Sequence, residues 1–166
     1  EADPARRGAY RACARFCRLA EALPRYAAPV VALDADALVR RDLRPLAARV
    51  TAVGLTTSPL SVPWNRHPAG FVVLRPGAAA QRFADDAAAL IGDSLGRGRR
   101  LWFLDQWALL LAARRHRPRR IPAAWTYDTG FGPRSWVWQA SDARKARNSL
   151  YLAERDRLTA RAERAS

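Results

Sequence analysis

Two aspartates one residue apart, Asp34 and Asp36, directly follow an apolar run that begins at Ala28. Residues i and i+2 of a strand point to the same side, so extended backbone through the run would bring both carboxylates into one small volume. Two unpaired carboxylates raise each other's pKa, which favours a cation between them. Hard oxygen ligands suit Mg2+ or Mn2+, particularly when phosphate oxygens complete the shell. The pair predicts a metal site; the alternative is that these aspartates cap a following turn or helix.

The segments around this pair alternate between strand and helix patterns. An amphipathic helix is expected over residues 10–23, and the apolar run reads as a strand that ends at Asp34. Further strands are predicted at 50–55 and 71–76, helices at 78–92 and 103–115, short extended pieces around Ile121, 125–127 and 136–138, and a peripheral charged helix at 148–164. This alternation favours an α/β protein with a mostly parallel or mixed sheet.

Length and composition predict a single globular domain over residues 1–166. A hydrophobic fraction of 49% and six tryptophans exclude a disordered chain, and Trp136 and Trp138 are expected to be mainly structural. Cys13 and Cys17 share one helix face and are expected to stay reduced thiols, which fits a cytoplasmic protein. Because no apolar stretch is long enough to span a bilayer, we expect the chain to be free in the cytoplasm or peripheral to the inner face of the membrane.

The net charge of +14 is carried almost entirely by arginine. Such a charge attracts nucleic acid, anionic lipid or phosphate-bearing substrates. No recognition helix, zinc-finger spacing or aromatic RNA-binding motif accompanies it, so a specific nucleic-acid partner is not expected. His116 lies in the basic segment 114–120 and is expected to be a solvated surface residue.

Five segments, in this order, resemble the retaining family 8 glycosyltransferases, which use nucleotide sugars and have the GT-A fold. They are 10–16 (the helix before the metal motif), 31–39 with 42–43 (the Asp-x-Asp strand and its sequel), 68–76 (the Asn-Ala-Gly strand), 104–109 (the Asp-Gln helix start) and 139–145 (the His-x-x-Gly-x-x-Lys segment). The resemblance covers about residues 8–150. It implies a GT-A mixed sheet flanked by helices, with the first strands missing because the nucleotide-binding βαβ portion is largely absent before Tyr10.

The resemblance also assigns a cofactor site. Asp34, Asp36 and Gln139 would hold Mn2+ or Mg2+, with Gln139 standing where the family has histidine. The cation would bridge the diphosphate of the donor and neutralise charge on the departing group. Lys145 would contact the same phosphates, and Ala35 would lie against the nucleotide sugar; the alternative for Lys145 is a solvated surface residue.

Two further pairs would face the donor sugar. The resemblance makes Asp105 and Gln106 the catalytic pair, hydrogen-bonded to sugar hydroxyls near the anomeric carbon. Because a carboxamide is neutral, Gln106 would position the sugar or support an oxocarbenium-like centre. The alternative for Asp105 is a helix N-cap. Ala69 and Gly70 would let the sugar approach the backbone closely, and otherwise Gly70 is a turn residue at a strand edge.

The resemblance therefore implies an enzyme that transfers a hexose from a nucleoside-diphosphate sugar, with UDP-hexose as the expected donor. The acceptor is a saccharide, a lipid-linked group or a protein. Pro68 replaces the family's asparagine and Asp142 its glycine, so an inactive carbohydrate- or nucleotide-binding relative or fragment is the first alternative. The second alternative is a basic module that binds anionic lipid or nucleic acid.

Overall fold

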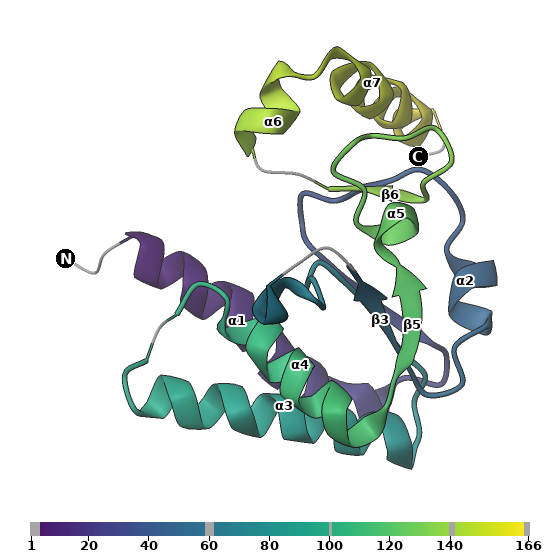
Figure 1. Cartoon of the computed structure of the whole chain (residues 1–166). Helices are drawn as coiled ribbons and strands as arrows, with labels where there is room; N and C mark the ends of the chain where they lie inside the picture. Colours follow the sequence, from purple (N-terminus) through teal and green to yellow (C-terminus); the bar gives the residue numbers. More distant parts are fainter. Residues whose placement is uncertain (1–3, 59–61, 100, 140–141, 165–166) are drawn as a thin grey trace.

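The computed structural model describes residues 4–58, 62–99, 101–139 and 142–164 (Figure 1). The elements, in chain order, are α1 (Pro4–Ala22), η1 (Leu23–Arg25), β1 (Val30–Leu33), β2 (Leu38–Val39), α2 (Arg44–Ala48), β3 (Val53–Thr57), η2 (Pro63–Asn65), β4 (Phe71–Leu74), α3 (Ala78–Gly96), α4 (Leu104–His116), β5 (Arg119–Pro122), α5 (Ala123–Thr126), β6 (Val137–Trp138), α6 (Asp142–Arg147) and α7 (Ser149–Glu163). None of the described helices is long and apolar enough to cross a membrane.

Four strands form a mixed sheet in the order β1-β4-β3-β5. Strand β4 is antiparallel to both of its neighbours, and β3 is parallel to β5, while β2 and β6 pair separately as a short antiparallel ribbon. The predicted α/β class with a mixed sheet flanked by helices is confirmed. Strands β1, β3 and β5 run in one direction, so their carboxyl ends lie at the edge where β4 begins. This edge carries Asp34 and Gly70, which are joined by a hydrogen bond from Asp34 N to Gly70 O (3.2 Å).

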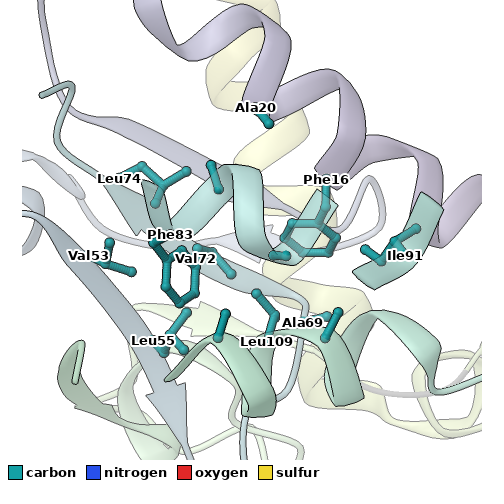
Figure 2. Packing of buried hydrophobic residues seen from close by; sticks show 14 of the residues in the cluster. Phe16, Ala20, Val53, Leu55, Ala69, Val72, Leu74, Phe83, Ile91 and Leu109 are labelled. Atoms are coloured by element: carbon teal, nitrogen blue, oxygen red, sulfur yellow. The ribbon is translucent and has the colours of Figure 1, made fainter. Parts of the chain in front are cut away.

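The sheet separates two apolar cores, because successive strand residues point to opposite faces. Val72 and Leu74 of β4 belong to the cluster that α1, α3 and α4 complete, whereas Phe71 and Val73 belong to the cluster beneath α2. The three long helices lie together on one side of the sheet in Figure 1, with α2 on the other. Figure 2 shows the larger core, in which Phe16, Phe83 and Leu109 from the three helices converge on Val72 and Leu74.

Several predicted elements have other bounds or another conformation. Helix α3 continues through Gly92 to Gly96, because one interior glycine costs only about 1 kcal/mol relative to alanine. The prediction of extended backbone at 125–127 is wrong, since α5 includes Thr126, whose buried hydroxyl lies 2.8 Å from that of Thr56. His116 is not fully solvated either: its Nε2 lies 2.9 Å from Asp86 Oδ2 and its ring packs edge-on against another aromatic side chain.

The charged segment at the C-terminal end forms α7, which lies beyond β6 in Figure 1. Its N-cap is Asn148, whose side-chain oxygen accepts a hydrogen bond from Tyr151 N (2.9 Å). Tyr151 is buried and packs against Phe131, with 5.3 Å between the ring centroids. The cap therefore fixes the turn that inserts the one buried aromatic side chain of this helix.

Loss of this cap should weaken the attachment of α7. Asn148→Ala is expected to lower the free energy of unfolding by about 1 kcal/mol, the usual value of an N-cap. Urea denaturation of the two proteins measures the difference. Asn148→Asp, which keeps a capping oxygen, serves as the control and should unfold at the wild-type midpoint. Equal losses in the two variants would exclude a capping role.

Candidate functional site

The backbone turns immediately after β1. Ala37 N donates a hydrogen bond to Asp34 O (3.0 Å), which closes a turn over residues 34–37. The prediction that extended backbone carries Asp34 and Asp36 to one side is therefore wrong, and the alternative of aspartates at a turn describes the backbone. The turn gives each carboxylate a separate cationic partner. Ala35 lies exposed between them.

Arg15 of α1 organises the first carboxylate. Its guanidinium pairs with Asp34, donates to the carbonyl oxygen of Ala69 (3.0 Å) and lies 3.5 Å from Asp105 Oδ2. One side chain thus ties α1 to the end of β1, the approach to β4 and the start of α4. Sequence reasoning gave Arg15 no role, although it occupies an apolar-stripe position, one residue before Phe16 and three after Ala12.

Asp105 is buried, with 4% of its surface exposed. The N-cap of α4 is Phe103, so the alternative that Asp105 caps this helix is wrong. Its Oδ1 accepts a hydrogen bond from the backbone N–H of Gln106 (2.8 Å). Burial raises the pKa of Asp105 above its ordinary value, and Asp34 raises it further, against the opposing effect of Arg15. Asp105 is therefore a buried carboxyl group whose charge depends on one neighbouring guanidinium.

Gln139 supplies a buried oxygen that lacks a partner. The residue is 2% exposed, and its Nε2 donates to Gly70 O (2.7 Å), yet its Oε1 has no hydrogen-bond partner in the described part of the chain. A Cβ on Gly70 would lie within 3.0 Å of both this Oε1 and Asp34 Oδ2. A neutral oxygen and a carboxylate oxygen therefore lie close together, packed against Gly70. A buried acceptor without a donor is costly, so a ligand that satisfies it is favoured.

The second carboxylate pairs with Lys145 of α6. Lys145 Nζ forms an ion pair with the Asp36 carboxylate and donates to Asp36 O (3.1 Å). The lysine side chain is only 9% exposed, so the alternative of a solvated surface lysine is wrong. Tyr151 also donates its hydroxyl to Asp36 O, at 3.4 Å. The Asp36 side chain is 57% exposed and remains open to a further ligand.

Tyr127 lies close to both groups. Burial raises the pKa of its hydroxyl, and the carboxylates of Asp34, Asp36 and Asp105 raise it further. The hydroxyl is therefore protonated at neutral pH and can donate a hydrogen bond. Nothing in the sequence indicated this role, because Tyr127 comes just after α5, more than ninety positions from the first aspartate along the chain.

The predicted site residues thus form two groups. Asp34, Ala69 and Asp105 contact Arg15, Gly70 and Gln139 adjoin Asp34, and Asp36 pairs with Lys145. Gln106 joins the first group through its backbone N–H; its partly buried side chain has an Oε1 without a hydrogen-bond partner among the described residues. The side chain of Asp142 lies outside the described part of the chain.

The side-chain types at this edge of the sheet determine which metal ions could bind there. Within residues 4–58, 62–99, 101–139 and 142–164, no three His, Cys, Asp or Glu side chains gather into a metal-binding group. A cation at this edge would therefore need an amide oxygen, and Gln139 Oε1 is a buried oxygen in the right place. All-oxygen donors fit Mg2+ or Mn2+ better than a softer metal. Comparisons of the chain with protein-family models, with curated proteins and with solved structures found no match.

Proposed function

We propose that this chain is a divalent-metal-dependent glycosyltransferase domain of GT-A type, which transfers a hexose from a nucleoside-diphosphate sugar to an acceptor. One observation carries the proposal. Gln139 Oε1 is buried without a donor in the described part of the chain, and it lies with Asp34 Oδ2 so close to Gly70 that no side chain would fit at position 70. A buried oxygen without a donor, beside a carboxylate oxygen, is an arrangement that a bound cation would satisfy.

Asp34, Asp36 and Gln139 would hold Mn2+ or Mg2+. When bound, the cation would neutralise charge on the departing diphosphate. Arg15 and Lys145 keep the two carboxylates in place without a metal, and cation binding must compete with these ion pairs. We therefore expect moderate metal affinity that increases when substrate phosphates add ligands.

The remaining groups of the site bind and orient. Lys145 lies at the exposed carboxylate, where its charge also suits a phosphate oxygen, and the Tyr127 hydroxyl offers a hydrogen-bond donor beside it. The Gln106 amide has an unused oxygen that can accept from a sugar hydroxyl. Because the Tyr127 hydroxyl and the Gln106 amide are neutral, these two groups contribute positioning and dipolar support of developing charge.

A second candidate is a relative that binds the nucleotide sugar without transferring it. The specific observation in its favour is that Arg15 and Lys145 already neutralise both carboxylates. In that case substrate binding would be independent of added metal, and no nucleoside diphosphate would be released.

Calorimetric titration with UDP-glucose and UDP-galactose, with and without Mn2+, tests the proposal. We expect binding that requires Mn2+ and is weakened by about 100-fold or more in Asp34→Asn and in Gln139→Ala, since even indirect metal contacts are worth 10- to 100-fold. Asp42→Asn, which removes an exposed carboxylate paired with Arg44, is the matched control and should bind normally. Release of UDP from the bound donor distinguishes transfer or hydrolysis from binding alone. Binding that Asp34→Asn leaves intact would contradict the proposal.

A further inference from the structure

A cavity of about 580 Å³ lies between the loop around η2, the second half of α4 and β5, and neither Asp34 nor Asp36 is among its described lining residues. Four arginines line it: Arg66, Arg114, Arg117 and Arg120. Its other described lining residues include His67 and no aspartate or glutamate. The lining therefore concentrates positive charge around a space large enough for a small organic ligand.

No described carboxylate forms an ion pair with these four arginines, whereas Arg15, Arg40 and Arg157 each pair with a carboxylate. All four arginines are exposed, and like charges gathered around one pocket repel one another and create a local positive potential. An anion that enters the cavity relieves this repulsion. The planar guanidinium fork binds phosphate oxygens through two parallel hydrogen bonds, so phosphate is the anion that the lining suits best.

His67 adds a neutral hydrogen-bonding group. It is 7% exposed, and its Nδ1 lies 3.1 Å from the carbonyl oxygen of Thr56. A carbonyl oxygen only accepts, so Nδ1 carries the proton and Nε2 is left as an acceptor. Burial, together with Arg66 and Arg120, lowers the pKa of His67, which keeps the ring neutral at pH 7. The cavity can therefore accept a hydrogen bond from a ligand hydroxyl as well as bind an anion.

An aromatic surface adjoins the same elements. Trp64 follows the lining residue Pro63, and Trp107 lies one turn before the lining residue Leu110; the two indoles are 6.2 Å apart. Trp102, just before α4, is 60% exposed. Indole surfaces of this kind cover the sugar or apolar part of a ligand, or lie at a membrane interface.

We propose that this arginine-lined cavity binds a phosphate group carried on an organic molecule, either a soluble phosphoester or the headgroup of a phospholipid. The phosphate lies among the guanidinium groups, and the organic part extends toward Trp64 and Trp107. This site needs neither the aspartates nor a metal, so it is independent of the proposed transferase activity.

Calorimetric titration with glycerol 3-phosphate and with pyrophosphate, in EDTA, tests whether the cavity binds a soluble phosphate compound. Cosedimentation with phosphatidylcholine vesicles, with and without phosphatidic acid, tests whether it binds a phospholipid headgroup. The pocket variant is Arg114→Gln with Arg120→Gln, and the matched control is Arg82→Gln with Arg161→Gln, which removes the same charge from exposed helix positions. Trp102→Ala should weaken vesicle binding and leave soluble phosphate unaffected.

We expect binding in the calorimetric experiment, the vesicle experiment or both. The affinity should fall tenfold or more in the pocket variant and less than twofold in the control variant. Binding in only the soluble or only the vesicle arm identifies the source of the phosphate and supports the site. Equal weakening by the pocket and control variants would show that overall charge, not the cavity, attracts the ligand. That result, or no binding in either arm, would overturn the proposal.

Discussion

Arg15→Met is expected to lower the free energy of unfolding at pH 7 by about 2–3 kcal/mol. Loss of one partner from a fully buried ion pair costs about 3–5 kcal/mol, and the Arg15 side chain is 26% exposed, which reduces the effect. The substitution leaves Asp105 buried without a counter-charge, although methionine retains much of the apolar volume of the arginine stem. Denaturant unfolding followed by circular dichroism measures the loss.

The loss should depend on pH in one direction. Removing Arg15 raises the pKa of Asp105 further above its usual value of 3.8, because the guanidinium opposes the effect of burial. A raised folded-state pKa gives stability that is present below the unfolded value and is lost as pH increases through the folded value. The deficit of Arg15→Met should thus be smallest below pH 3.8 and grow toward neutral pH.

Asp105→Asn added to Arg15→Met is the control for this mechanism. It removes the buried charge, so the double variant should recover part of the lost stability at pH 7 and lose most of the pH dependence. The coupling between the two positions follows from the four proteins of a double-mutant cycle. A deficit that is the same at every pH, or no recovery in the double variant, would show that Arg15 acts through packing alone.

Gly70→Ala is the second substitution with a large expected effect. The added methyl would lie within 3.0 Å of Asp34 Oδ2 and Gln139 Oε1, closer than real Cβ atoms approach such atoms. Because Gln139 is buried, relief requires its side chain to move, and we expect a cost of about 1–3 kcal/mol in unfolding free energy. Displacement of the two oxygens should also abolish metal-dependent substrate binding.

Gly92→Ala is the matched control, because nothing lies within 4 Å of a Cβ at that helical position. It is expected to stabilise the chain by about 0.5–1 kcal/mol, the helix propensity difference. Gly70→Ala combined with Gln139→Ala should be less destabilised than the sum of the two single changes, since the nearer of the two clash partners is gone. A Gly70→Ala protein as stable as wild type would show that Asp34 and Gln139 are not packed closely against Gly70.

Local patterns predicted the helices and strands well where apolar residues recur at the spacing of a helix or form a continuous run. Phe71 to Leu74 form a buried strand within the predicted segment 71–76, and the apolar stripe predicted for the first helix is buried in the larger core. These signals are carried by neighbours in the sequence, so tertiary structure alters them little. The position of Asp105 and Gln106 at the start of α4 was predictable for the same reason.

The arrangement of the site depended on contacts between distant segments. The turn at Asp34 separates the two carboxylates. Aspartate is a common turn residue, but the apolar strand pattern before it also favoured extended backbone through both aspartates. Arg15 and Tyr127 enter the site only because α1 and the segment after α5 approach the same sheet edge. Lys145 reaches Asp36 across more than a hundred positions. Such pairings follow from the packing of helices on the sheet, which a linear pattern does not encode.

Titration of Mn2+ into the protein, followed by the electron paramagnetic resonance signal of free Mn2+, tests the central claim most directly. We predict one site per chain, weakened about 100-fold in Asp34→Asn and Gln139→Ala and unchanged in the surface control Asp42→Asn. Arg15→Met should bind Mn2+ more tightly than wild type, because the competing guanidinium is gone. Mn2+ binding of equal strength in wild type, Asp34→Asn and Gln139→Ala would contradict the assignment of a metal site to this edge of the sheet.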